Sequence, residues 1–291
     1  MNRSGAIIFD SRSIFDRGFY ASQRSEEMQH MRVAKAATCS SLMVLLPILS
    51  GYRLDKAYSD ALFCWDGGRK TDKPRKPHPP GFDEALEYFK ALLPTLVGGA
   101  HVTAPGEGDD AVATAAIREA EAGRDCLVVS GDKDMHQLVG NHIGYYCLNQ
   151  KSLLSAPAIM DKYGIKHPSH VAIYLAIVGD KIDGIDGVKN WGHVKATKLL
   201  ADSPVDLGKA IALVESAIPP DQVDNFYAAL EATLLQVDVV GIPEPAPIKA
   251  APLDFIDDEE LDPIRSMYAR FIGSLGTDED AASTFDIDAE A

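Results

Sequence analysis

Residues 128–139 read VVSGDKDMHQLV, and this stretch carries the strongest indication of the fold. The apolar run 127–129 is typical of a short buried strand, and the Ser-Gly pair after it ends the strand. Asp132 and Asp134 follow immediately, with Lys133 between them. Because open α/β sheets bind ligands at the carboxyl ends of their strands, we expect an α/β fold with these carboxylates at its functional edge.

Two other apolar runs end in an aspartate. Residues 6–9, AIIF, lead to Asp10, and residues 60–65, DALFCW, lead to Asp66. A helix is expected over residues 104–123, and its first turn contains Glu107, Asp109 and Asp110. Acidic side chains at a helix N-terminus also complement the helix dipole, so this turn alone does not identify a site. Together with the strand ends, it indicates a shared acidic centre.

The rest of the pattern is mostly helical. A glycine-rich turn over residues 179–192 separates two helices, the second beginning near His193, and it contains Asp180 and Asp183. Backbone N–H groups in such a turn can bind a phosphate. Further elements are expected at residues 12–24, 32–49 with an interruption at Pro47, 82–93, 144–148 (a strand), 169–178, 206–235 and 265–275.

The composition, 46% hydrophobic and 24% charged, is that of a soluble globular protein. We recognise no apolar run of about 18–20 residues and no secretory signal, so we expect a cytoplasmic protein without a membrane partner. The four cysteines form no C-x-x-C pair and are expected to be reduced and buried. The net charge is −15, but residues 253–291 hold 12 acidic and 2 basic residues, so nucleic-acid binding elsewhere is not excluded.

Nine carboxylates stand at these strand ends, helix starts and turns: Asp10, Asp66, Glu107, Asp109, Asp110, Asp132, Asp134, Asp180 and Asp183. Carboxylates brought together repel one another unless a cation neutralises them. Oxygen ligands suit Mg²⁺, with Mn²⁺ as a substitute, whereas no His or Cys falls at the spacing of a zinc site. Two such ions about 4 Å apart can hydrolyse a phosphodiester without a side-chain nucleophile.

Five ordered motifs resemble the bacterial and bacteriophage branch of the 5′-3′ exonuclease and flap endonuclease family, which includes the amino-terminal nuclease domain of bacterial DNA polymerase I. They are IIFDSRSIFDRGFYA, LFCWDGGR, GEGDDAVATAA, VVSGDKDMHQLV and GDKIDGIDGVKNWGHVKATKLL, within residues 5–202. The resemblance implies a PIN-like (Rossmann-like) α/β fold, with a mainly parallel sheet flanked by helices. It implies a nuclease domain over residues 1–168 and a helix–three-turn–helix DNA-binding region over residues 169–240, with residues 241–291 as a linker and an acidic, partly disordered tail.

The resemblance also assigns roles to the acidic residues. The first metal ion is expected at Asp10, Asp66, Glu107, Asp109, Asp110 and Asp132. The second is expected at Asp132, Asp134, Asp180 and Asp183, so that Asp132 lies near both ions. The residues expected to act most directly in catalysis are Asp132, Asp109, Asp110 and Lys133, whose ammonium is expected to touch the substrate phosphate.

DNA contacts are expected from three places. Arg17 falls where the family has a basic residue on the first helix. The basic, Pro-rich segment 67–81 is either a solvated loop or a contact with the phosphate backbone through Arg69, Lys70, Lys73, Arg75 and Lys76. The turn from Gly187 to Gly192, followed by Lys195, is expected to hold duplex DNA and a K⁺ ion.

The chain departs from the family pattern in three places. Asn190 and His193 replace a glycine and a proline of the usual turn, and Asn tolerates the left-handed conformation. Residues 69–80, where the family has a helical arch, are short and contain four prolines, so we expect a reduced or non-helical clamp that favours nicked or 5′-ended substrates. The acidic tail either increases solubility or binds a replication protein or the enzyme's own DNA track.

The sequence therefore predicts a monomeric, Mg²⁺-dependent 5′-3′ exonuclease and structure-specific flap endonuclease. Its expected substrates are nicked, branched or 5′-ended duplex DNA and RNA–DNA hybrids, in phage replication and primer removal within the host cytoplasm. Three alternatives remain. A PIN-type ribonuclease would lack residues 179–200, a catalytically silent DNA-structure binder would lack metal ligands, and an Asp-x-Asp phosphatase would carry that motif after the first strand, where the chain has Asp10-Ser11-Arg12.

Overall fold

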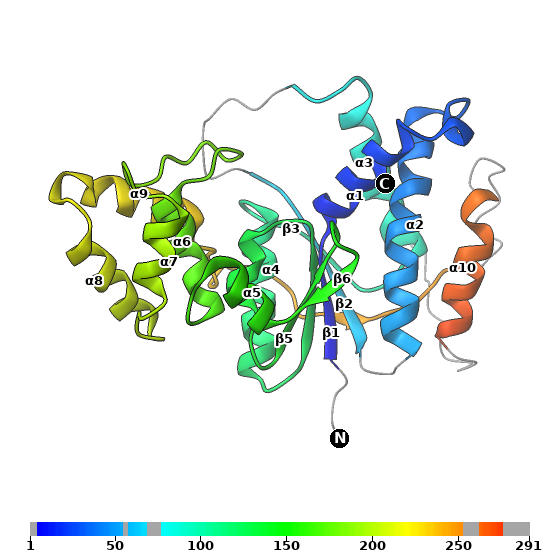
Figure 1. Cartoon of the computed structure of the whole chain (residues 1–291). Coiled ribbons are helices and arrows are strands. Elements are labelled where there is room, and N and C mark those ends of the chain that lie inside the picture. The colour runs from blue at the N-terminus through cyan, green and yellow to red at the C-terminus, as the bar shows by residue number, and fades with distance from the viewer. Residues whose placement is uncertain (1–4, 55–57, 69–76, 253–261, 276–291) are drawn as a thin grey trace. The chain divides into compact units, whose positions relative to one another are not determined.

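The computed structural model describes residues 5–54, 58–68, 77–252 and 262–275 (Figure 1). Contacts divide the chain into two compact units: residues 1–65, 75–103 and 242–291 form the first, and residues 66–74 and 104–241 form the second. The predicted segment boundaries after residues 168 and 240 stay predictions.

The first unit contains mainly parallel strands with helices packed on them. Its elements are β1 (Gly5–Asp10), α1 (Ser11–Ser22), η1 (Glu26–Met28), α2 (Val33–Leu54), β2 (Tyr58–Trp65), α3 (Phe82–Leu96), β3 (Ala100–Thr103), β7 (Ala246–Pro247) and α10 (Asp262–Ser274). Strands β1 and β3 pair in parallel with β2, and the short β7 pairs with β2 in the antiparallel direction. Phe9 stacks on Phe63 at 4.8 Å, and Phe15 contacts Phe82 and Phe89 at 5.2 and 5.9 Å between ring centroids. These rings form much of the core between sheet and helices.

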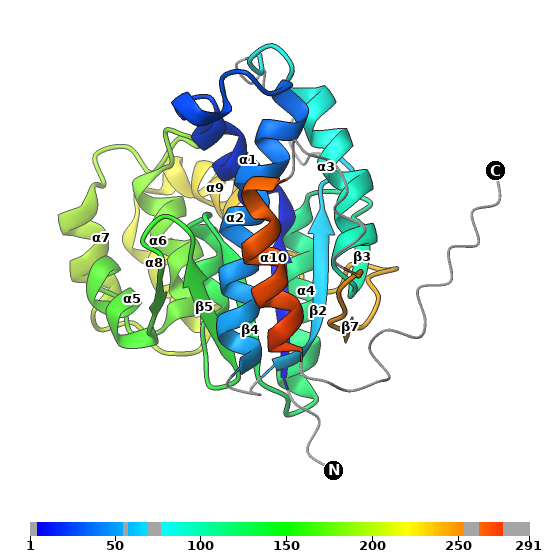
Figure 2. The ribbon, with the colours of Figure 1, turned by 90° about the vertical axis from the view of Figure 1, so that its right-hand side faces the viewer.

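Helix α2 is almost wholly apolar. Its residues Val33–Tyr52 have a mean hydropathy of 1.6 and are long and apolar enough to cross a membrane by length and composition alone. Within the structure, however, 61% of that window is buried, and α10 lies alongside α2 (Figure 2). The hydroxyl of Tyr268 on α10 donates to the carbonyls of Leu96 and Ala251 at 2.6 and 3.1 Å. Burial of this kind is typical of a core helix.

The expectation that the chain has no apolar run of this length is therefore wrong. The polar residues Thr38 and Ser41 interrupt the apolar run in the sequence. Their hydroxyls donate to the carbonyls of Ala34 and Ala37 at 2.8 Å each, so these polar groups are satisfied inside the helix. Pro47 was also expected to interrupt the helix, and α2 continues through it. Because Pro47 is exposed, the carbonyl that loses its hydrogen bond there can be hydrated.

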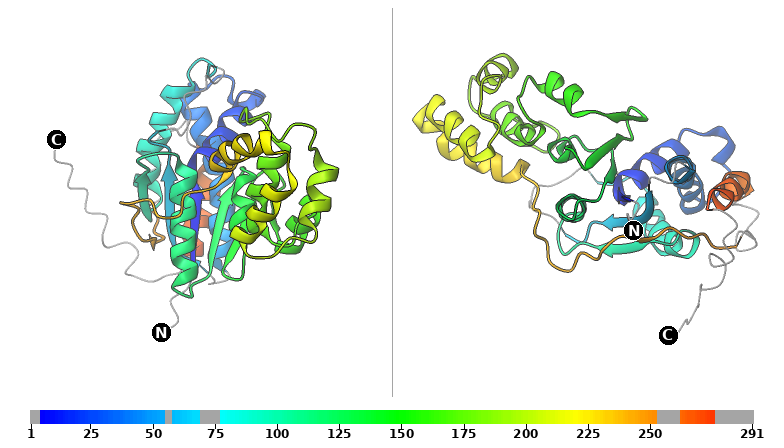
Figure 3. Two further views of the ribbon diagram at one scale, coloured as in Figure 1. Left: turned by 90° about the vertical axis from the view of Figure 1, so that its left-hand side faces the viewer. Right: turned by 90° about the horizontal axis from the view of Figure 1, so that it is seen from below.

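The second unit contains three strands and a group of helices. Its elements are α4 (Gly108–Glu121), β4 (Cys126–Ser130), η2 (Asp134–Leu138), β5 (Ile143–Cys147), β6 (Ser152–Leu154), α5 (Ala156–Tyr163), η3 (Pro168–His170), α6 (Val171–Val178), α7 (His193–Leu200), α8 (Leu207–Ala217), η4 (Pro220–Gln222) and α9 (Val223–Thr233). Strand β4 pairs in parallel with β5, and β6 pairs with β5 in the antiparallel direction. Helix α6 packs against α7 and α9 (Figure 3).

Most predicted elements are confirmed, with boundaries shifted by a few residues. The helix expected from residue 104 begins at Gly108, because Pro105 and Gly106 belong to the turn before it. The helical stretch expected over residues 206–235 is divided into α8 and α9. Pro219 and Pro220 divide it because proline cannot donate the backbone hydrogen bonds that a continuous helix needs.

The crossing of α1 and α2 depends on the missing side chain of Gly18. A Cβ atom at this position would lie 2.5 Å from the backbone nitrogen of Ser41. Gly18→Ala should therefore lower the free energy of unfolding by about 1–3 kcal/mol, the usual effect of overpacking. Gly51→Ala is the matched control, because Gly51 lies on α2 with nothing within 4 Å of the added Cβ. It should stabilise the helix by about 0.5–1 kcal/mol. Denaturant unfolding measures both, and equal effects would contradict this packing argument.

Candidate functional site

The turn after β4 holds two of the predicted carboxylates in a fixed geometry. The backbone N–H of Asp132 donates to Ser130 Oγ at 2.9 Å, and the backbone N–H of Asp134 donates to Asp132 Oδ1 at 2.8 Å. From β5, the hydroxyl of Tyr145 donates to the carbonyls of Ser130 and Asp132 at 3.0 and 2.9 Å. The turn therefore presents both aspartates at the carboxyl end of β4, as the sequence predicted.

Lys133 connects this turn to the turn after α6. Its ammonium forms an ion pair with Asp180 Oδ2 and lies 3.5 Å from Asp183 Oδ2. The backbone groups of Asp180 and Ile185 exchange two hydrogen bonds of 2.8 and 2.7 Å, which close the turn. The structure thus brings together the two parts of the predicted second metal group.

Two glycines shape the turn after α6. Gly179 has a positive φ of 84°, and Gly187 packs directly against it: a Cβ on Gly187 would lie 2.5 Å from the Gly179 nitrogen and from the Ile177 carbonyl oxygen. Gly187 was expected to serve DNA binding, and the structure gives it this additional packing role. The contact fixes the backbone that carries Asp180 and Asp183.

Burial and mutual repulsion shift the pKa values of these carboxyls. Burial, followed by the charge of Asp132, raises the pKa of Asp134 to about 7. Burial and a hydrogen bond with Asp180 raise the pKa of Asp183. Burial also opposes ionisation of Asp180, but hydrogen bonds with Lys133 and Asp183 outweigh it and hold its pKa below the usual value. The surroundings therefore cannot keep all of these carboxyl groups ionised. A bound cation would reduce the repulsion between the carboxylates and favour their ionised forms.

The donor set fits a hard divalent ion. All its donors are carboxylate oxygens, and Asp134 Oδ1 is buried without a hydrogen-bond partner in the described structure. Within the described ranges, no three His, Cys, Asp or Glu side chains are placed closely enough to hold a metal ion. At the second group, the ammonium of Lys133 lies against both Asp180 and Asp183.

The predicted first group is divided between the two units. Asp66 Oδ1 accepts a hydrogen bond of 2.7 Å from the backbone N–H of Gly108, so Asp66 is tied to the first turn of α4. Glu107 is the N-cap of α4 without a side-chain cap bond, and Asp109 in the first turn is half-buried. Asp10 belongs to the first unit, where it is the N-cap of α1. Its predicted place beside the other carboxylates stays a prediction.

Asp110 is held by a segment that the sequence did not single out. Asp110 is 4% exposed, and its Oδ1 accepts from the backbone N–H of Gln236 at 2.9 Å. One turn further along α4, Thr114 Oγ1 accepts a hydrogen bond of 3.1 Å from the backbone N–H of Val239. Residues 233–239, the last residue of α9 and the six that follow it, therefore reach α4. We call them the brace.

Gln137 ties the same brace to the turn after β4. Its Nε2 donates to the carbonyls of Asp134 and Thr233 at 2.9 and 3.1 Å, and its Oε1 accepts from the N–H of Leu235 at 3.3 Å. Gln137 thus sets the position of Asp134 relative to the helices that end at residue 233. Sequence patterns do not indicate this role, because Thr233 and Leu235 lie 96 and 98 positions from Gln137.

The predicted DNA-contacting residues have three different outcomes. Five of them lie in residues 69–76, outside the described structure: Arg69, Lys70, Lys73, Arg75 and Lys76. Arg17 lies on α1 in the first unit and is half-buried. Gly192 is exposed at the N-cap of α7, and Lys195 on α7 donates to the carbonyl of Asn190 at 2.9 Å. The left-handed conformation expected at Asn190 is confirmed by its φ of 62°.

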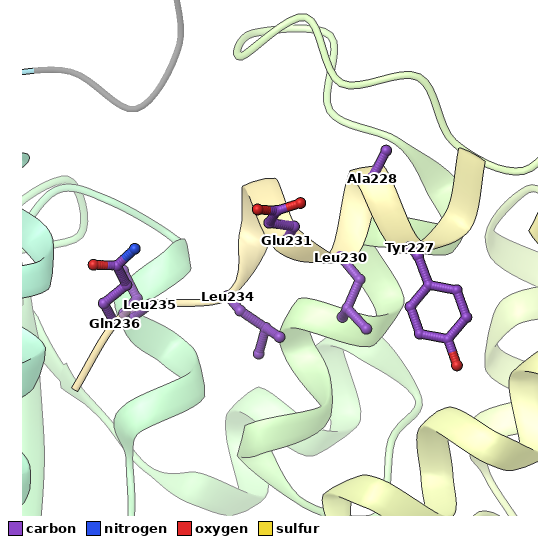
Figure 4. Close-up of a pocket in the computed structure, with 7 residues that line it drawn as sticks. All are labelled: Tyr227, Ala228, Leu230, Glu231, Leu234, Leu235 and Gln236. Carbon is purple, nitrogen blue, oxygen red and sulfur yellow. The ribbon is translucent and has the colours of Figure 1, made fainter. Parts of the chain in front are cut away.

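A hollow of about 610 Å³ lies on α9 and the start of the brace (Figure 4). It is lined by Tyr227, Ala228, Leu230, Glu231, Leu234, Leu235 and Gln236. None of the nine predicted metal ligands is among these residues, so the hollow does not mark the acidic centre. The hollow is connected to the predicted site only indirectly: the backbone N–H of Gln236, one of its lining residues, donates a hydrogen bond to Asp110.

Comparison with known proteins gives one family. The family model described as "5'-3' exonuclease, N-terminal resolvase-like domain" matches residues 5–164. The chain is 36% identical over 138 residues to the thermostable DNA polymerase I of Thermus aquaticus, covering 47% of this chain and 16% of that protein. It is 35% identical over 175 residues to a 5′-3′ exonuclease of Buchnera aphidicola subsp. Acyrthosiphon pisum, covering 56% of this chain and 60% of that protein.

A solved structure shares the fold. The D15 flap endonuclease of bacteriophage T5, solved as a pseudo-enzyme–product complex with DNA and metal ions, superposes with a TM-score of 0.59. The match covers 92% of this chain and 99% of that one at 13% sequence identity. The two chains therefore share an α/β fold with a mainly parallel sheet flanked by helices, as the sequence predicted.

The raised pKa of Asp134 predicts how stability depends on pH without metal. Asp134 holds its proton more tightly in the folded protein, with a pKa of about 7, than at the ordinary value of 3.8. Its contribution to stability is complete below about pH 4 and is lost as the pH rises through about 7. Asp134→Asn mimics the protonated form. In chelator, thermal unfolding should give the variant and the wild type similar Tm values at about pH 4, and the variant the higher Tm at about pH 8. A difference that does not change with pH would contradict this assignment.

Proposed function

The chain belongs to the family of 5′-3′ exonucleases with an N-terminal resolvase-like domain, and from this premise we propose that it hydrolyses phosphodiester bonds of DNA at 5′ ends and flaps with divalent metal ions. The observation that carries the proposal is the acidic turn after β4, joined through Lys133 to Asp180 and Asp183. The chain spans only part of its relatives' length, so its substrates are inferred from this turn and the family.

The carboxylates divide into two groups in this proposal. Asp66, Glu107, Asp109 and Asp110, with Asp10 and Asp132, would hold the first ion, and Asp132, Asp134, Asp180 and Asp183 would hold the second. When bound, two Mg²⁺ ions would lower the pKa of an attacking water and stabilise the leaving oxygen. Asp132 is suited to a place between the groups because its carboxylate is anchored by the Asp134 N–H and its backbone by Ser130 and Tyr145.

DNA binding is proposed for the helices α6 to α9 as a helix–three-turn–helix region. Gly192 leaves the N-terminus of α7 uncovered, with nothing within 4 Å of an added Cβ, so a phosphate could approach the backbone N–H groups there. Lys195 places a positive charge beside that turn, 5.7 Å from the ring of Trp191. A K⁺ ion at this turn, and phosphate contacts by Arg17 and by the basic residues of segment 69–76, belong to the same proposal.

The proposed setting is DNA replication, including removal of RNA primers from RNA–DNA hybrids, in a cytoplasm. A bacteriophage source belongs to the same proposal. The protein is proposed to act as a monomer, and the acidic residues of 253–291 to keep it soluble or to bind a replication protein. The short, Pro-rich segment 69–80 supports a preference for nicked and free 5′ ends over threaded flaps.

Cleavage of matched substrates tests the proposal. A duplex, a nicked duplex and a flap, each labelled at the 5′ end, should yield short labelled products only when Mg²⁺ is present. Asp132→Ala should abolish them, and Asp134→Ala should reduce them less at saturating Mg²⁺, because Asp132 is proposed to serve both ions. Asp161→Ala removes an exposed carboxylate of α5 and should leave cleavage unchanged.

Two outcomes would overturn the proposal or part of it. The absence of any Mg²⁺-dependent product, or an unchanged rate in Asp132→Ala, would contradict the proposed nuclease function. Equal losses in Asp132→Ala and Asp134→Ala would leave a nuclease but remove the proposed division of labour between the two aspartates.

A further inference from the structure

Lys133 occupies a place among the predicted metal ligands that a substrate contact alone does not explain. Its ammonium pairs with Asp180 Oδ2 and lies 3.5 Å from Asp183 Oδ2, so one positive charge faces two carboxylates. Asp180 is 6% exposed at its side chain, whereas Lys133 is 30% exposed. The cation is thus partly open to solvent, and its main partner is buried.

We propose that Lys133 is a built-in counter-ion of the second metal group: it holds Asp180 and Asp183 together when no metal is bound, and it must leave before a divalent ion can bind there. The inference rests on the proposed function of these carboxylates. It goes beyond that function because it makes metal loading a competition with a side chain of the protein itself.

The competition follows from which oxygen of Asp180 the ammonium of Lys133 contacts. Asp180 Oδ1 accepts a hydrogen bond of 3.0 Å from the backbone N–H of Ile182. Oδ2 is the oxygen that Lys133 contacts. A metal ion that binds Asp180 Oδ2 therefore takes the place of the ammonium. The two cations would also repel each other at that distance, so binding of one opposes binding of the other.

The rigidity of the Asp180 turn decides which partner moves. The two hydrogen bonds between Asp180 and Ile185 close the turn, and the backbone of Gly179 packs closely against that of Gly187. Lys133 has a long, flexible side chain with an exposed portion. When an ion binds, the ammonium moves away and the carboxylates stay. The released ammonium is then available to a phosphate at the same site.

Binding of Mn²⁺ to the full chain without DNA tests this competition by isothermal titration calorimetry. Lys133→Gln removes the internal cation. Of the two Mn²⁺ ions, the one that is bound more weakly should bind to this variant about tenfold more tightly than to the wild type. Lys133→Arg keeps the positive charge and should bind like the wild type. Lys166→Gln removes an exposed lysine elsewhere in the second unit and should also leave the affinity unchanged.

A second readout does not depend on the titration. In chelator, Lys133→Gln should have a lower Tm than the wild type, because Asp180 and Asp183 lose their counter-charge. Saturating Mn²⁺ should then raise its Tm by more than it raises the Tm of the wild type. Circular dichroism at low temperature verifies that each variant is folded before these values are compared.

The outcomes separate the failure of this inference from that of the proposed function. Unchanged or weaker Mn²⁺ binding by Lys133→Gln, in a protein whose wild type binds Mn²⁺ and cleaves DNA, overturns the counter-ion role alone. Binding by Lys133→Arg as tight as by Lys133→Gln overturns it too, since charge would then not be the cause. If neither the wild type nor any variant binds Mn²⁺, both the inference and the proposed metal-dependent function fail.

Discussion

Repulsion between carboxylates is the constraint on which the account of this protein depends. In the second unit, Asp132, Asp134, Asp180 and Asp183 are carried by two turns, one after β4 and one after α6. The ammonium of Lys133 balances only part of their charge. Burial and the remaining repulsion between the carboxylates raise the pKa values of Asp134 and Asp183. A fold that keeps acids in this arrangement gives up stability near neutral pH unless a cation joins them. We therefore read the arrangement as functional rather than structural.

The fold holds these acids through three separate devices. Side-chain and backbone hydrogen bonds fix the turn after β4, with Tyr145 bonded to two of its carbonyls. Backbone contact between Gly179 and Gly187 fixes the turn after α6. The brace of residues 233–239 connects the end of α9 to α4 and to Gln137. Through the brace, helices proposed to bind DNA are joined covalently and by hydrogen bonds to the carboxylates proposed to act on it.

Much of the site could be predicted from sequence because its signals are local. An apolar run followed by Ser-Gly and two aspartates marks the end of β4, and Asn190 in a glycine-rich turn takes the left-handed conformation that its type permits. The rest depends on partners that are distant in sequence. The hydrogen bond from Gln236 to Asp110 spans 126 positions. The spacing of apolar residues along the sequence does not indicate which distant residues form such a bond. Part of the burial of α2 similarly depends on α10, which lies more than 200 residues away.

Anomalous diffraction from crystals soaked in Mn²⁺ tests the central claim most directly, because it locates the ions without relying on activity. Two Mn²⁺ peaks are expected about 4 Å apart near Asp132, one of them on Asp180 Oδ2 with the Lys133 ammonium moved away from that oxygen. Peaks remote from these carboxylates, or no Mn²⁺ peak with Lys133 still paired to Asp180 at saturating metal, would contradict it.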